Sequence, residues 1–377
     1  KCCVSGAGER VIDYAAKRLK VGGLILEEGD FISLNGSTGD VYLGAVATKE
    51  AELDADFSEL MGLCDKYTKL VVRTNADTPY DAGIAREFGA VGIGLCRTEH
   101  MFFEGEKIRA MREMILAETV EERRRALSKI LPFQQDDFKG IFKAMAGCPV
   151  TVRLLDPPLH EFVPHYEKEQ RELAEIMGVT YDYIRERVDS LHEANPMLGH
   201  RGCRLGNTYP EITEMQTRAI LGAALDLKAE GVETLPEIMV PLTGILQEVV
   251  AQEKVIRETA AKLFDKRKDS VDFKVGTMIE IPRAALTADR IASNAEFFSF
   301  GTNDLTQMTF GYSRDDIASF LPAYLDMKIL PNDPFQVLAQ NGVGQLVRMA
   351  TEKGRPIRPD LTCGIGGEHG GDPSSVE

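Results

Sequence analysis

The sequence has no tryptophan, no Cys-x-x-Cys pair and no long apolar run. A membrane span needs roughly 18–20 consecutive apolar residues, so we expect no membrane partner. The seven cysteines are odd in number and lack metal-binding spacing, which predicts free thiols in a reducing compartment. A basic surplus is also absent: the net charge of −15 argues against a nucleic-acid or anionic-membrane partner.

What is present is typical of an ordinary globular protein. The chain has 377 residues, of which 44% are hydrophobic and 27% are charged. This length and composition predict a sizeable core and two or three domains. The acidic balance still permits an anionic small substrate, because local arginines can outweigh a global field.

The first part of the chain predicts a small α/β unit followed by a linker. Residues 10–20 have an amphipathic helical pattern, and residues 21–44 contain short β-rich runs split by Asn35-Gly36 and Gly39-Asp40. We assign 1–45 to this unit. The acidic, helix-prone stretch 46–67 is interpreted as a linker.

From residue 68 a different rhythm predicts a parallel α/β fold. Eight short apolar segments follow one another, and each but the last precedes a helical pattern. Alternating βα units of this number favour a (β/α)8 barrel with helical insertions, and a doubly wound sheet is the alternative. The segments cover 69–77, 91–103, 148–158, 195–206, 235–244, 273–284, 295–307 and 360–371. The basic run 121–125 in the first insertion is interpreted as a solvated helix face.

Polar residues follow almost every predicted strand, and in a parallel barrel these strand ends converge on one face. Arginine side chains match phosphate and carboxylate oxygens, and a carboxylate pair suits Mg²⁺. The pattern predicts a site for a small phosphorylated acid with magnesium. The alternative is that these residues form salt bridges between loops. They are Arg73, Asn75, Asp77, Arg97, Glu99, His100, Arg153, Asp156, Arg201, Arg204, Glu280, Arg283, Asn303, Asp304, Glu368 and His369.

Long motifs within the chain resemble the pyruvate, phosphate dikinases of the phosphoenolpyruvate (PEP)-utilising enzymes. They are GLCRTEHMFF, TVRLLDPPLHEF, GHRGCRLG, GTMIEIPRA, SFGTNDLTQMTFGYSRDD and GEHGGDPSSVE. The resemblance implies a TIM-type barrel over 68–377 whose final helix is missing. It also implies that 1–45 is the remaining half of a swivelling phosphohistidine domain. Residues 1–6 resemble the continuation of the phosphohistidine motif, so a C-terminal fragment is expected.

The resemblance also implies an activity and its partners. The barrel would transfer a phosphoryl group between a phosphohistidine and pyruvate, which forms PEP. This is one half of the dikinase reaction of ATP, pyruvate and phosphate. Upstream phosphohistidine and ATP-grasp domains and a homodimer formed through the barrel are implied as partners. The compartment would be the cytoplasm or an organelle such as a plastid or glycosome.

The family's functional residues carry over onto single positions of this sequence. Arg97, Arg153 and Arg201 match the arginines that hold the phosphoryl group. Glu280 and Asp304 match the Mg²⁺ ligands. The substrate-binding residues that match are Gly301, Thr302, Asn303 and Arg314.

One position departs from the family pattern. Gly366 stands where the family has the cysteine that protonates the enolate, and the nearby Cys363 is three residues away. Because strand side chains alternate, we expect Cys363 to face the helices instead. The alternatives to a dikinase are a PEP synthase, an Enzyme I-like phosphotransferase, or a fragment that binds PEP without turnover.

Overall fold

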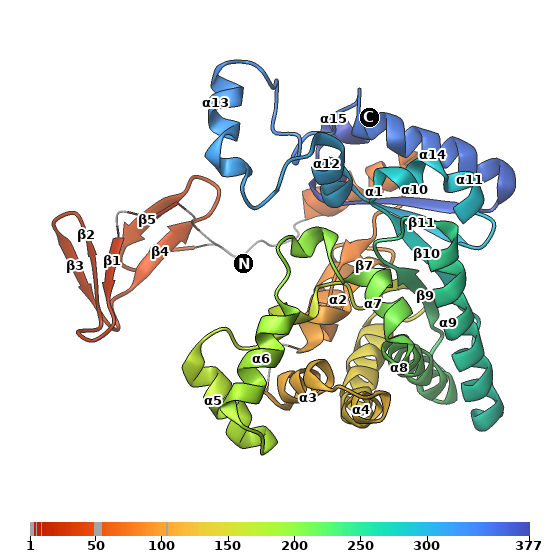
Figure 1. Cartoon of the computed structure of the whole chain (residues 1–377). Helices are drawn as coiled ribbons and strands as arrows, with labels where there is room; N and C mark the ends of the chain where they lie inside the picture. The colour runs from red at the N-terminus through yellow and green to blue at the C-terminus, as the bar shows by residue number, and fades with distance from the viewer. Residues whose placement is uncertain (1–3, 5, 9, 49–54, 103–104) are drawn as a thin grey trace. The chain divides into compact units, whose positions relative to one another are not determined.

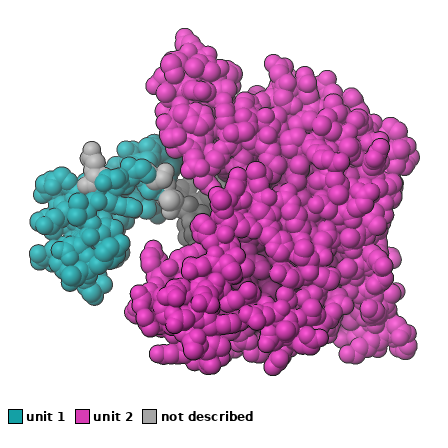
Figure 2. All heavy atoms as spheres, viewed as in Figure 1, with its two compact units in different colours: residues 1–70 teal, residues 71–377 magenta. Residues whose placement is uncertain are grey.

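A computed structural model describes residues 4, 6–8, 10–48, 55–102 and 105–377. The chain divides into two compact units, Lys1–Leu70 and Val71–Glu377 (Figure 2). The motif start at residues 1–3 and part of the linker lie outside the described residues. The assignment of 1–45, 46–67 and 68–377 to particular domains therefore stays a prediction.

The described residues of the smaller unit form two antiparallel sheets and one helix. Asp13 accepts hydrogen bonds from the backbone N–H groups of Ala15 and Ala16, at 3.1 and 2.9 Å, and so forms a tight turn. The helix predicted over 10–20 is therefore wrong, because this turn joins two strands. None of the described residues of this unit is buried. Its elements are β1 (Arg10–Asp13), β2 (Arg18–Val21), β3 (Leu24–Glu27), β4 (Ile32–Asn35), β5 (Asp40–Leu43) and α1 (Ala55–Tyr67).

The larger unit is built around a curled, wholly parallel sheet (Figure 1). Its seven strands follow one another in sequence order, and each pairs with its neighbours in the chain. This is the barrel-type α/β architecture that the alternating pattern predicted. The strands are β6 (Thr74–Asn75), β7 (Ile93–Arg97), β8 (Pro149–Arg153), β9 (Leu235–Val240), β10 (Lys274–Ile279), β11 (Phe297–Gly301) and β12 (Thr362–Gly366).

The fourth of the eight predicted strands is wrong. Residues 195–206 contain the turn η3 (Pro196–Leu198) and the start of the helix α7 (Gly202–Thr208). Gly202 has a φ of +57°, a left-handed conformation that is rare for other residues. A Cβ atom there would also lie 2.7 Å from Cβ of Leu242. Glycine is thus required at the start of α7.

Helices cover the outer face of the sheet. One buried cluster packs α2 (Pro79–Glu87), α4 (Val120–Ala144), α8 (Pro210–Ala229) and α9 (Leu246–Arg267) against β7–β10. A second packs α10 (Pro282–Leu286), α11 (Ala288–Ile291) and α14 (Val343–Ile357) against β10 and β11. The inner face is filled at one level by Leu95, Met239, Met278 and Phe297. Side chains therefore alternate between the helix layer and the interior of the curled sheet.

A third cluster holds the helical insertions together. It joins α3 (Gly105–Leu116) and α4 to the turn η2 (Leu159–Phe162) and to α5 (Glu167–Met177) and α6 (Tyr181–Leu191). The basic run at the start of α4 is not a fully solvated face. Arg123 is buried, forms an ion pair with Glu211 of α8 at 3.3 Å, and covers the ring of Tyr209.

The remaining elements lie in the C-terminal part. They are α12 (Thr302–Phe310), η4 (Ile317–Ser319), α13 (Leu321–Asp326), η5 (Glu368–Gly370) and α15 (Pro373–Val376). Among the described residues, no helix is both long and apolar enough to cross a membrane.

Candidate functional site

Strand alternation brings the predicted site residues to the inner face of the sheet. Val152 packs into the outer cluster, so the next residue, Arg153, faces inward at the end of β8. Ile279 likewise packs outward, and Glu280 follows it inward. Arg97 and Arg153 are paired neighbours at the ends of β7 and β8. The C-terminal edge of the sheet therefore holds these residues together, as the strand-end pattern predicted.

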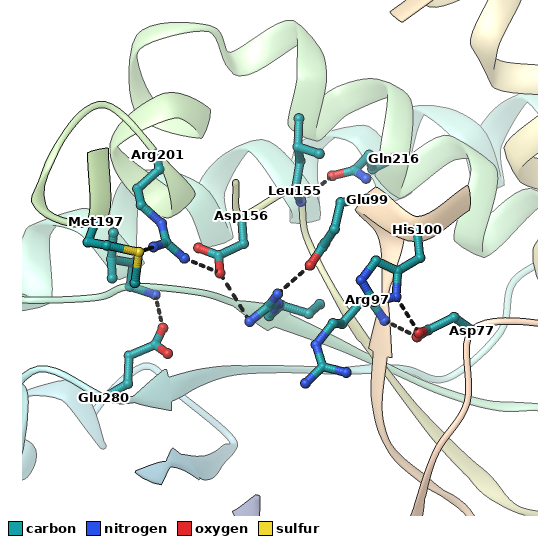
Figure 3. Close-up of polar contacts among 12 residues, drawn as sticks. Asp77, Arg97, Glu99, His100, Leu155, Asp156, Met197, Arg201, Gln216 and Glu280 are labelled. Carbon is teal, nitrogen blue, oxygen red and sulfur yellow. Dashed lines mark hydrogen bonds and ion pairs between the residues drawn. The ribbon is translucent and has the colours of Figure 1, made fainter. Parts of the chain in front are cut away.

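Arg153 is the centre of a buried ion-pair network (Figure 3). Its Nη2 donates to Oε1 of Glu99 at 2.5 Å, and its Nη1 lies 3.0 Å from Oδ2 of Asp156. The same oxygen of Asp156 accepts from Nη2 of Arg201 at 2.7 Å. Asp156 thus links two of the three arginines. The sequence identified Glu99 and Asp156 only as strand-end residues and assigned them no role.

This network shifts the pKa values of its members. Burial favours the neutral form of Arg153, but the carboxylates of Asp156, Glu99 and Glu280 raise its pKa overall. Burial also opposes ionisation of Asp156, yet Arg153 and Arg201 hold its pKa below the ordinary range. The arginines are thus cations, and Asp156 is an anion that bridges them.

Glu280 and Asp304 form a second, incompletely paired cluster. Oε1 of Glu280 accepts from the backbone N–H of Leu242 at 2.6 Å. Leu242 has a φ of +56°, an uncommon conformation for a residue with a side chain. The other oxygen of Glu280 is buried and has no hydrogen-bond partner among the described residues. Burial, and then repulsion from Asp304, raise the pKa of Glu280 well above its usual range.

Asp304, the other carboxylate of this cluster, also has a raised pKa. Burial, together with the charge of Asp156, raises its pKa, although Arg201 and Arg153 oppose this. In the part of the chain that the structure describes, no group of three or more His, Cys, Asp or Glu side chains could hold a metal ion by itself. Two adjacent carboxylates, one with an unpartnered buried oxygen, nevertheless fit a cation that takes its other ligands from substrate and water.

Arg97 is held through its backbone. Oδ1 of Asp77 accepts from the N–H of Arg97 at 2.6 Å, and Oδ2 lies 2.7 Å from Nδ1 of His100. In Figure 3 the guanidinium of Arg97 points away from both residues. Within the described ranges no ion pair involves this guanidinium. It is therefore the arginine of the three that remains available to an anion.

Gly301, Thr302 and Asn303 lie at the junction of β11 and α12. Gly301 is the last residue of β11, and the helix begins at Thr302. Oγ1 of Thr302 donates to the carbonyl of Gly366 at 2.6 Å, which ties β12 to this junction. Oδ1 of Asn303 is buried and has no partner among the described residues. Arg314 forms an ion pair with Glu368 at 2.6 Å, and both side chains are about half exposed.

The position of Gly366 is open. A Cβ atom built there would meet only the carbonyl oxygen of Phe300, at an ordinary 3.7 Å. Cys363 packs instead into the cluster that α10, α11 and α14 form on the outer face of β10 and β11, and burial raises the pKa of its thiol. Its sulfur interacts with Thr351 of α14. Cys363 therefore faces the helix layer, as the alternation predicted.

Four predicted strand-end residues have other contacts. Arg73 precedes β6, and its Nη1 donates to Oε2 of Glu237 at 2.6 Å. Arg204 donates to the carbonyls of residues 198 and 199, and Arg283 donates to that of residue 244. His369 is buried, with Nε2 3.0 Å from the carbonyl of Pro334. Arg204, Arg283 and His369 thus hold loops together, which is the alternative that the sequence left open, whereas Arg73 pairs with a residue of β9.

Comparison with known proteins connects this geometry with one family. Residues 51–377 match the family described as PEP-utilising enzyme, PEP-binding domain. All of the chain aligns with "Pyruvate, phosphate dikinase" of Clostridium symbiosum at 57% identity, and it covers 43% of that protein. All of the chain also aligns with "Pyruvate, phosphate dikinase 1, chloroplastic" of Arabidopsis thaliana, at 58% identity and with 39% of that protein covered. For "Pyruvate, phosphate dikinase" of Giardia intestinalis the identity is 55% and the covered share is 42%. The chain thus spans about two fifths of the length of these relatives.

Proposed function

The chain belongs to the PEP-utilising enzymes, through their PEP-binding domain, and from this premise we propose that its larger unit binds PEP and pyruvate. In a longer protein it would carry the half-reaction of a pyruvate, phosphate dikinase, which transfers a phosphoryl group between a phosphohistidine and pyruvate. The observation that supports this proposal most directly is the cluster of arginines and carboxylates at the C-terminal edge of β7–β11. The names of the curated relatives support the dikinase over the related synthase and Enzyme I.

The arginines would bind the phosphoryl group. Phosphoryl transfer depends on placement and charge stabilisation more than on covalent chemistry from the protein. Arg97 offers a guanidinium free of ion pairs in the described ranges. Arg153 and Arg201 each have a buried Nε atom without a hydrogen-bond partner there. These donors offer the phosphoryl oxygens three guanidinium groups, two of which are held in place by ion pairs.

The charge balance of the site supports a magnesium requirement. Three arginines face four carboxylates, so one negative charge is in excess when all are ionised. An added anion would then be repelled unless a cation or proton compensates. Glu280 and Asp304 would hold Mg²⁺, which when bound stabilises negative charge on the phosphoryl and enolate oxygens. The carboxylates concerned are Glu99, Asp156, Glu280 and Asp304.

The remaining predicted residues would orient the carboxylate end of the substrate. The backbone N–H groups at the start of α12, from Thr302 and Asn303, suit an anionic oxygen. Arg314, next to Glu368, would contribute a further cation at the outer side. Gly366 occupies the position of the family's proton donor and supplies no acid itself. We therefore propose PEP binding for this chain, with enolate protonation reduced or absent.

The proposed partners follow from the family. Upstream phosphohistidine and ATP-grasp domains would exchange the phosphoryl group with this unit, and a homodimer would form through the barrel. The compartment is proposed to be the cytoplasm or an organelle, and several matched relatives are named chloroplastic.

A calorimetric titration tests the proposal. PEP should bind to the chain in the presence of Mg²⁺ and at least tenfold more weakly in chelator. Arg97→Ala should weaken this binding without a loss of folded structure. If the intact chain shows no saturable PEP binding with Mg²⁺ or Mn²⁺, the proposed function is wrong. For the longer protein, PEP formation that depends on inorganic phosphate would separate a dikinase from a synthase.

A further inference from the structure

We propose that Glu99 is a positioning residue: it holds the guanidinium of Arg153 in the orientation that receives the phosphoryl group. The inference rests on the proposed function for its ligand. It assigns a role to a residue that itself need not touch the substrate.

Glu99 and Asp156 together occupy both terminal nitrogens of Arg153. Nη2 donates to Glu99 at 2.5 Å, and Nη1 pairs with Asp156 at 3.0 Å. The two carboxylates come from different segments, one after β7 and one after β8. A planar guanidinium held at two edges cannot rotate freely, and its Nε–H then points in one fixed direction. That Nε is buried and has no hydrogen-bond partner among the described residues, so it is one of the donors left for a ligand.

The support for Glu99 is itself rigid. Glu99 lies in the turn η1 (Thr98–Phe102), directly after β7. Met101 of this turn packs into the cluster between the helices α2, α4, α8 and α9 and the outer face of β7–β10. Phe102 packs into the separate cluster of the helical insertions. Two separate cores therefore fix one short turn. The carboxylate is thus in place before any ligand arrives.

Arg153 has a particular need for this support. It is the paired neighbour of Arg97 on the adjacent strand, so two cations lie side by side. Without Glu99, repulsion between them would favour other rotamers of Arg153. Ordering a long side chain on binding costs affinity, and a side chain ordered in advance avoids that cost.

The sign of one effect separates positioning from simple electrostatics. Glu99 carries a negative charge close to a site for an anion. If charge alone mattered, removal of that charge by Glu99→Gln would tighten PEP binding. If Glu99 positions Arg153, the same change weakens PEP binding, because a neutral amide oxygen holds the guanidinium less strongly than the carboxylate does.

Calorimetry of the intact chain with Mg²⁺ provides the test, and Glu211→Gln is the matched control. Glu211 pairs with Arg123 in a comparably buried ion pair outside the strand-end cluster: the two side chains are 3% and 7% exposed, against 5% and 9% for Glu99 and Arg153. We expect Glu99→Gln to weaken PEP binding about tenfold, with pyruvate affinity changed less than about twofold. Glu211→Gln should leave both affinities unchanged. Equal or tighter PEP binding by Glu99→Gln would overturn the proposal.

A second measurement does not depend on the ligand. In a crystal structure of ligand-free Glu99→Gln, the guanidinium of Arg153 should be displaced or occupy several positions, and a single unmoved position would overturn the inference. If the unaltered chain fails to bind PEP while Arg153 is still displaced in the variant, the proposed function is wrong and the positioning role stands.

Should Glu99→Gln not fold, Glu99→Asp keeps the charge but withdraws it by one methylene, and weaker PEP binding is again expected. Unchanged PEP affinity in that variant would contradict the proposal.

Discussion

A Cβ atom on Gly301 would lie 2.8 Å from Oε2 of Glu280, closer than real Cβ atoms approach a neighbour. Oε2 is also the oxygen of Glu280 that has no hydrogen-bond partner among the described residues. The glycine at the end of β11 thus leaves room for the carboxylate that would bind the metal.

Gly301→Ala should therefore displace the Glu280 carboxylate. We expect a loss of about 1–3 kcal/mol in the free energy of unfolding from overpacking, and a marked loss of Mg²⁺-dependent PEP binding. Thermal unfolding and calorimetry measure the two effects. Gly364→Ala on the adjacent strand is the control, because a Cβ atom there meets nothing within 4 Å. PEP affinity that is equal in the two variants would contradict this role of Gly301.

Asp304→Ala tests the proposed metal pair. Removal of one carboxylate should leave Glu280 unable to hold Mg²⁺ by itself, so PEP affinity should no longer respond to Mg²⁺. Metal-free PEP binding should change little or improve, because a negative charge has been removed. Titrations with and without chelator provide the measurement. An unaltered Mg²⁺ response in Asp304→Ala would show that the metal is bound elsewhere.

The raised pKa of Glu280 predicts a pH-dependent stability. In the folded chain the pKa of Glu280 lies well above 4.5, the ordinary value expected in the unfolded chain. In the pH window between these two values, only the folded state keeps the proton on Glu280. The metal-free protein should then lose stability as pH rises through the window. Mg²⁺ should offset this loss, since a metal stabilises the ionised form. Unfolding midpoints measured over a pH series, with Mg²⁺ or chelator, test the effect.

Glu280→Gln is the control for that series. The amide can still accept from the N–H of Leu242 but has no proton to release. Both the pH-dependent loss in chelator and the Mg²⁺ response should become smaller. A Mg²⁺ response of undiminished size would argue against Glu280 as its origin.

Gly366→Cys should restore proton transfer to the enolate. The site has room for the side chain, because its Cβ atom would make one ordinary contact with the carbonyl of Phe300. A general acid typically contributes about 10²–10⁴ in rate. Hydrogen–deuterium exchange into the methyl group of pyruvate, with Mg²⁺ present, measures the gain. If exchange is no faster than in the Gly366 protein, the proton does not come from this position.

Strand alternation explains why much of the site could be predicted from the sequence. A period of two places Arg153 and Glu280 on the inner face and Cys363 on the outer face, whatever the details of the loops. Arg73 could not be placed in this way. The strand β6 consists of only Thr74 and Asn75, so Arg73 precedes it and reaches Glu237 rather than the strand-end cluster.

Two further errors arose where a local contact decided the structure. The sequence of residues 195–206 is compatible with a strand, but the left-handed Gly202 begins a helix there. The amphipathic pattern of residues 10–20 is interrupted by the turn that Asp13 stabilises.

The ion pairs of Glu99 and Asp156 depend on side-chain directions that spacing along the chain does not specify. Their roles required the three-dimensional structure.

The most direct test of the account is a crystal structure of the chain with PEP and Mn²⁺, whose anomalous scattering locates the metal. We predict one Mn²⁺ bound by Glu280 and Asp304, with the phosphoryl group of PEP in contact with Arg97 and Nε of Arg153. A metal peak away from both carboxylates, or PEP bound outside the C-terminal edge of the sheet, would contradict the account.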